Sequence, residues 1–185
     1  MARAVQRDDG AALAAVHRPP QGGGWITKAR SAALARLAAM GLPVRRDEYW
    51  KFTSPERLLT PSPPAAAVPV PEDPVFHGIA RLRLVFTGGR FDAAASDDPA
   101  AAGLEVTSLA EAARADIHWA RDLYGALEAE GQAPVARPLA ALNTGIAAEG
   151  VLIRVTGTAT RPVELVYHAS SEASEVFLHH CIKLE

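Results

Sequence analysis

The spacing of apolar residues predicts a short helix near the start of the chain. Between Thr27 and Gly41, apolar side chains recur three and four positions apart: Ala29, Ala33, Leu37 and Met40. This spacing places them on one face of an α-helix. Thr27 suits an N-cap, Gly41 suits a left-handed C-cap, and Pro43 prevents continuation. A helix this short gains most of its stability by packing on another part of the protein.

Strand and helix patterns follow each other in the middle of the chain. Apolar residues alternate with others over residues 81–86, which predicts a half-buried strand. Gly88 and Gly89 suit a turn, after which residues 90–91 can return as a second strand. Helical spacing resumes over residues 108–130, and a further short helix is expected over residues 139–147.

The last third of the chain changes to the period of β-structure. Alternation over residues 151–156, 163–168 and 176–184 predicts three short strands, in a sheet or in the first coils of a β-solenoid. The third strand is expected to place five residues on one face: Val176, Leu178, His180, Ile182 and Leu184. It reaches Glu185 without a turn. We therefore expect a truncated protein, whose exposed terminal strand lacks its neighbour and favours self-association.

These patterns predict an α+β protein with four regions. Residues 1–60 form an N-terminal helical region. Residues 61–74 contain six prolines, which remove backbone donors and favour an extended linker. Residues 75–136 mix strand and helix, and residues 137–185 open an incomplete strand-rich region.

Composition narrows the class of protein. The chain has 185 residues, 49% hydrophobic and 22% charged, as in an ordinary globular protein. Its formal net charge of -2 argues against a general attraction to nucleic acid or anionic lipid. Residues 1–17 carry charges where a secretory signal needs an apolar core, and no window is apolar over the roughly 18 residues of a membrane span. We therefore expect a cytoplasmic protein.

One cluster of metal-capable residues occurs, at His179, His180 and Cys181. Cys181 is the single cysteine, which excludes an intramolecular disulfide and a four-cysteine metal site. On a strand, His179 and Cys181 share one face and His180 points to the other. The face of His180 is otherwise apolar, so we interpret it as a hydrogen-bonded core histidine.

Two alternatives are open for the face of His179 and Cys181. A metal site needs a further ligand, and His168 on the preceding strand is the nearby candidate. A thiol nucleophile needs a base, and His179 is close in sequence. No third, orienting group is visible for such a nucleophile. We therefore assign no catalytic, cofactor-binding or metal-binding residue in this chain.

Residues 45–52 combine charges and aromatic rings more densely than any other segment. Basic residues interleaved with rings can stack nucleic-acid bases. Here Asp47 and Glu48 cancel two arginines, so we favour a structural interpretation. Trp50 and Phe52 are expected to anchor the segment, while the charged side chains stay solvated or pair locally.

The same segment resembles a family signature. Residues 41–53, GLPVRRDEYWKFT, resemble the N-terminal pattern GLP-x-R-x-x-E-x-W-K-[FY]-T of SufD in the SufB/SufD family. Residues 84–91, LVFTGGRF, are similar to the family segment LVFVNGRF. Residues 139–144, LAALNT, with residues 150–153, GVLI, resemble a helix-to-first-coil junction. Residues 161–166, RPVELV, resemble the strand entry RPIHLV.

This resemblance implies a scaffold role in iron–sulfur cluster assembly. It implies that residues 137–185 are the opening coils of a right-handed parallel β-helix, and that SufB-like and SufC-like subunits are the partners. The iron–sulfur cluster, and possible flavin binding, belong to the full complex. In the family, the SufC-binding helices and the late β-helix residues tied to cluster formation lie beyond the matched region, so no site residue transfers to this chain. The alternatives are a small metal- or thiol-dependent enzyme and a generic β-solenoid interaction module.

Overall fold

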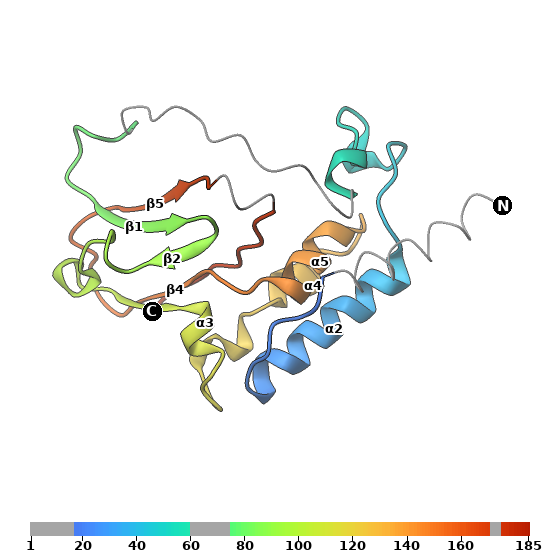
Figure 1. Cartoon of the computed structure of the whole chain (residues 1–185). Coiled ribbons are helices and arrows are strands. Elements are labelled where there is room, and N and C mark those ends of the chain that lie inside the picture. The colour runs from blue at the N-terminus through green and yellow to red at the C-terminus, as the bar shows by residue number, and fades with distance from the viewer. Residues whose placement is uncertain (1–16, 60–74, 171–174) are drawn as a thin grey trace. The chain divides into compact units, whose positions relative to one another are not determined.

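The computed structural model describes residues 17–59, 75–170 and 175–185, which form two compact units (Figure 1). Each unit is built from two stretches of chain. Residues 17–59 join residues 113–148, and residues 75–112 join residues 149–185. The two units therefore do not coincide with the four consecutive regions expected from the sequence. The predicted linker at residues 61–74 lies outside the described residues.

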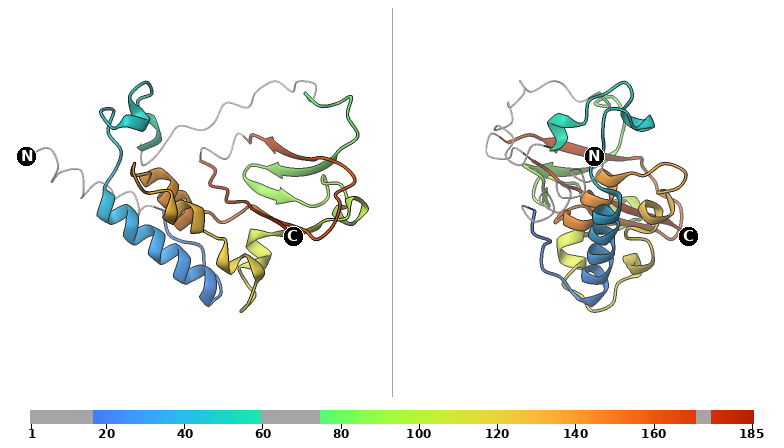
Figure 2. Two further views of the ribbon diagram at one scale, coloured as in Figure 1. Left: turned by 180° about the vertical axis from the view of Figure 1, so that it is seen from behind. Right: turned by 90° about the vertical axis from the view of Figure 1, so that its right-hand side faces the viewer.

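The first unit is helical, and its main contact is between α2 (Gly24–Met40) and α5 (Pro138–Ile146). The two views of Figure 2 show these helices side by side. The packing explains why residues 138–146 join the first unit, although the sequence grouped them with the strands that follow. Its other short elements are η1 (Glu48–Trp50), η2 (Glu56–Leu59), η4 (Trp119–Asp122) and α4 (Ala126–Glu130).

The predicted first helix is confirmed, with a different start. Gly23 is the N-cap, and Thr27 lies inside the helix, where its hydroxyl donates to the Gly22 carbonyl at 3.1 Å. Gly41 has the positive φ expected of a helix-ending glycine, 78°, and its N–H donates to the Leu37 carbonyl. Its ψ of -178° keeps it outside the left-handed helical region.

The helical pattern predicted over residues 108–130 is broken into α3 (Leu109–Ala112), η4 and α4. Two local features interrupt it. The His118 side chain accepts a hydrogen bond from the Ala120 N–H and caps η4, and Gly125 adopts a left-handed conformation with φ 74° before α4. Apolar spacing alone does not reveal such interruptions.

The second unit contains two small sheets, the first with strand order β2-β1-β5. β1 (Leu82–Thr87) and β2 (Arg90–Asp92) form the predicted antiparallel hairpin. Gly88 and Gly89, with φ of 56° and 77°, make its turn. β5 (Val163–His168) pairs with β1 in parallel along its full length.

The second sheet has strand order β3-β4-β6. β3 (Glu105–Ser108), which follows η3 (Pro99–Ala102), pairs antiparallel with β4 (Val151–Val155). β6 (Cys181–Leu184) pairs with β4 in parallel. The predicted α+β class is confirmed, and the described strands form two small mixed sheets, with neither a closed barrel nor a β-helix among them.

The core of the second unit is made mainly by β1, β4 and the segment around η3. Its buried members are Leu82, Leu84, Phe86, Ala102, Leu104, Val151 and Ile153. Alternate residues of β1 enter this core, as the sequence pattern predicts. Val163, Leu165 and Leu178 pack against it while partly buried.

The third strand predicted at residues 176–184 is shorter than expected. β6 begins at Cys181, and Leu178 makes an isolated bridge to Glu149. Ile182 pairs with the core residue Ile153, so both lie on the same face of the sheet, yet Ile182 is 58% exposed. The apolar pattern therefore marks a face that the described residues cover only in part. No helix in the described part of the chain is both long and apolar enough to cross a membrane.

Candidate functional site

His180 lies just before β6 and is bonded to two other strands. Its Nδ1 accepts a hydrogen bond from the Val151 N–H at 3.0 Å, and its Nε2 lies 3.0 Å from the Tyr167 hydroxyl oxygen. The Phe86 ring meets it edge-on, with centroids 5.4 Å apart. Burial lowers the pKa of His180 below its ordinary value. The predicted hydrogen bonding of His180 is confirmed, but the residue is half-buried instead of a core residue and lies before β6 instead of on a strand.

Cys181 is buried next to it, at the start of β6. Burial raises the pKa of its thiol to about 11, so the thiol is protonated at neutral pH and is a weak nucleophile. Among the described residues, no three histidine, cysteine or acidic side chains lie together in a group that could hold a metal ion. The structure therefore does not bring His168, His179 and Cys181 together as a ligand set.

Residues 44–53 form a largely exposed turn around η1, and the preceding residues 41–43 are buried or half-buried. The Tyr49 side chain is bound by Arg137, whose guanidinium lies 5.1 Å from the ring centroid and donates to the hydroxyl at 2.8 Å. Phe52 is 92% exposed, so the expectation that it anchors the segment is wrong. It follows η1 in a solvent-facing turn, whereas Trp50 is half-buried. Asp47 pairs locally as expected, because its carboxylate accepts from the Val44 N–H at 2.8 Å.

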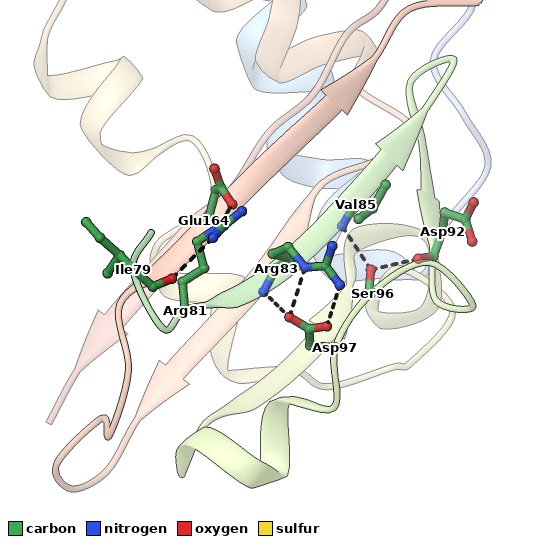
Figure 3. A network of polar contacts seen from close by, with 8 residues as sticks. All are labelled: Ile79, Arg81, Arg83, Val85, Asp92, Ser96, Asp97 and Glu164. Atoms are coloured by element: carbon green, nitrogen blue, oxygen red, sulfur yellow. Dashed lines mark hydrogen bonds and ion pairs between the residues drawn. The ribbon is translucent and has the colours of Figure 1, made fainter. Parts of the chain in front are cut away.

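Figure 3 shows the polar contacts that fix the entry to β1. Arg81 forms an ion pair with Glu164 of β5. The same guanidinium donates to the carbonyl oxygens of Phe76, at 2.6 Å, and Ile79, at 3.2 Å. One arginine thus joins the segment before β1 to the start of β5, a contact that no local sequence pattern predicts.

A second group of contacts in Figure 3 occupies backbone donors of β1. Asp97 accepts from the Arg83 N–H at 2.8 Å and from its guanidinium at 3.0 Å, and these hydrogen bonds hold the pKa of Asp97 below its usual value. The Ser96 hydroxyl accepts from the Val85 N–H at 2.9 Å and donates to the Asp92 carbonyl at 2.6 Å. Asp97 and Ser96 thus accept hydrogen bonds from backbone N–H groups of β1, along the part of the strand that the short β2 does not fully pair.

A groove of about 380 Å³ follows the outer edge of β5. Three of its lining residues, 163–165, are consecutive in the strand. Consecutive side chains point to opposite faces of a sheet, so they line one groove only if it runs along the strand edge. The lining is mainly apolar, with one charged pair: Phe76, Ile79, Arg81, Pro162, Val163, Glu164 and Leu165.

β5 and β6 are the end strands of their sheets within the described chain. β5 pairs only with β1 and β6 only with β4, so each leaves one edge without a described strand. Ile182 and Leu184 of β6 are 58% and 76% exposed. Unpaired edges with apolar side chains attract further strands. We call the outer edges of β5 and β6, with the β5 groove, the open edges, and they form the candidate functional surface.

The sequence matches no protein-family model, and a search of curated proteins found no significant match.

Proposed function

We propose that this chain is a non-catalytic scaffold subunit of an iron–sulfur cluster assembly complex of the SUF type. In this proposal its strands are the opening coils of a right-handed parallel β-helix. The partners are SufB-like and SufC-like subunits in the cytoplasm, and the iron–sulfur cluster, with any flavin, belongs to the assembled complex.

The observation that carries this proposal is the way the strands alternate between two sheets. The chain passes from β4 in one sheet to β5 in the other, and then returns to β6 beside β4. Leu152 pairs with Cys181, so the chain returns to its own sheet after roughly 30 residues, within the period of solenoid coils. The parallel pair β4–β6 is the stacking expected between successive coils, whereas the parallel pair β1–β5 joins strands about 80 residues apart.

The positions of the resembling segments also support the proposal. Residues 84–91 form most of the β1–β2 hairpin. Residues 139–144 lie in α5 and residues 150–153 open β4, as a helix-to-coil junction requires. Residues 161–166 lead into β5 and form most of it. Residues 139–153 and 161–166 therefore fall in elements of the kind that the resemblance implies, a helix followed by a strand and the entry to a strand.

Antiparallel strands cover the opposite edges of both sheets. β2 pairs with β1, and β3 pairs with β4, on the sides away from β5 and β6. A solenoid needs such a cap at one end because a bare edge recruits other chains. The open edges then form the end at which partners dock.

The proposal is tested by purifying the tagged protein from its own host and identifying what is bound. A SufB homologue is expected in stoichiometric amounts, since a scaffold subunit acts inside a stable complex. Direct binding of SufC is not expected, because the SufC-binding helices of the family lie beyond the region that this chain resembles. A matched culture carrying the same tag on an unrelated cytoplasmic protein controls for carry-over. Recovery of the tagged protein without the SufB homologue contradicts the proposed function.

The open edges also predict self-association of the isolated chain. Sedimentation velocity at increasing concentration is expected to show a growing dimer or larger species, because β6 exposes Ile182 and Leu184 beside an unpaired edge. Ile182→Lys is expected to shift the population to monomer. Ile117→Lys is the matched control, since Ile117 is 81% exposed and lies in no strand. A monomer at every concentration contradicts this prediction.

A further inference from the structure

One histidine joins three strands of the second unit. His180 precedes β6, its Nδ1 accepts from the N–H of Val151 at the start of β4, and its Nε2 lies beside the hydroxyl of Tyr167 on β5. We call these three residues the His180 junction. Gly150, next to Val151, lies under the backbone of His179, so the chain is closely packed at this point.

The hydrogen-bond partners fix the protonation of the ring. A backbone N–H can only donate, so Nδ1 must be unprotonated to accept from Val151. A neutral imidazole carries its one proton on the other nitrogen. Nε2–H therefore donates to the Tyr167 hydroxyl oxygen, and both ring nitrogens of the neutral form are satisfied.

A second proton has no place in this arrangement. It binds at Nδ1 and turns that atom into a donor that faces the Val151 N–H. Two donors then point at each other, and the bond that ties His180 to β4 is lost. We propose that the His180 junction is an acid-sensitive contact, whose protonation breaks the bond between His180 and β4 and loosens the start of β6 against it.

The surroundings of His180 favour the neutral ring. Phe86 of β1 packs against it, and Tyr167 is the titratable side chain that β5 presents to it. Glu149, His179 and Cys181 are ionisable residues on the two segments that pair beside the junction. Burial is the cause that lowers the pKa of His180, with no contribution from a charged neighbour.

The direction of the pH effect follows from this pKa. The folded state has a pKa below the ordinary value of 6.5, so the opened state binds the proton more readily. The contact is fully stable above about pH 6.5 and weakens as the pH falls toward the folded-state pKa. Within that window, opening is expected to increase by up to about tenfold for each unit of pH.

Hydrogen exchange of the intact chain between about pH 7.5 and about pH 5 tests the proposal. After correction for the intrinsic exchange rate, protection of the β6 amides and of Val151 is expected to fall with pH. His180→Gln keeps an acceptor and a donor without titrating, so it should remove this fall. His168→Gln, which changes an exposed histidine on β5, should keep it.

Nitrogen-15 spectra of the His180 ring give a second measurement that needs no substitution. The expected result is the Nε2–H tautomer at neutral pH, with the Val151 amide shift following the titration of the ring. A ring protonated on Nδ1 at neutral pH overturns the proposal. So does a loss of β6 protection that is the same in His180→Gln and in the parent chain.

Discussion

Gly150→Ala is expected to destabilise the second unit by at least about 3 kcal/mol, which combines a strained backbone with an overpacked contact. Gly150 has a φ of 155°, a conformation that residues with a side chain rarely adopt. A Cβ at this position would lie 2.7 Å from the carbonyl carbon of His179 and closer still to its oxygen. The obstacle is backbone, which cannot rotate away as a side chain can.

Neighbouring bonds keep that backbone in place. The His179 N–H donates to the Glu149 carbonyl at 3.0 Å, and His180 is tied to Val151. To admit the methyl group, the segment before β6 must move away from β4, which breaks these contacts together. The expected loss is therefore larger than that of an ordinary glycine substitution in a loop.

Gly157→Ala is the matched control for this prediction. Gly157 lies in the connection between β4 and β5, and nothing lies within 4 Å of the position of an added Cβ. The free energy of unfolding of Gly157→Ala is expected to stay within about 0.5 kcal/mol of that of the parent chain. Amide exchange of the β4 and β6 residues measures both variants. Equal protection in Gly150→Ala and Gly157→Ala contradicts the close approach at His179.

The sequence predicts individual elements where local spacing is strong. The helix ending at Met40, the β1–β2 hairpin and the strands β4 and β5 all follow from apolar periodicity and turn residues. The pairing of these strands is a long-range property. The parallel contact between β1 and β5 joins residues about 80 positions apart, and no local pattern specifies such a register.

The candidate site also depends on long-range contacts that local sequence patterns do not specify. His180 is predicted as a hydrogen-bonded histidine because it interrupts an apolar alternation, and the structure adds its partners on β4 and β5. Phe52 is mispredicted as an anchor because a ring in a short turn is held only by contacts from distant segments, and Arg137 contacts Tyr49 instead. The groove along β5 depends on Arg81 holding the preceding segment, a contact across the fold.

Arg30 is the largest omission of the sequence analysis, and a signal for it exists. Ile26, Ala33 and Leu37 are buried along α2, and Arg30 falls on the same stripe with 1% exposure. A charged residue in the middle of an apolar stripe has to be explained by hydrogen bonds. The stripe predicted from the sequence shares Ala33 and Leu37 with the buried one, but it starts at Ala29 and so passes over Arg30.

The guanidinium of Arg30 satisfies two backbone carbonyl groups. One terminal nitrogen donates to the Pro20 oxygen at 2.9 Å, and the other donates to the Ala147 oxygen at 2.7 Å. Pro20 precedes α2 and Ala147 follows α5, so one side chain links the ends of two segments far apart in sequence. Removal of the donors leaves buried acceptors unpaired, at about 1–3 kcal/mol each.

Arg30→Ala is therefore expected to destabilise the first unit by about 4 kcal/mol, through lost hydrogen bonds and lost volume. Arg30→Met keeps most of the volume and should lose about 2 kcal/mol. Lys28→Met, at an exposed position of the same helix, should stay within about 0.5 kcal/mol. Urea unfolding followed by tryptophan fluorescence measures all three, because Trp25, Trp50 and Trp119 lie in the first unit. If Arg30→Met is as stable as the parent chain, desolvation of the guanidinium outweighs its hydrogen bonds, and the proposed link between Pro20 and Ala147 does not stabilise the unit.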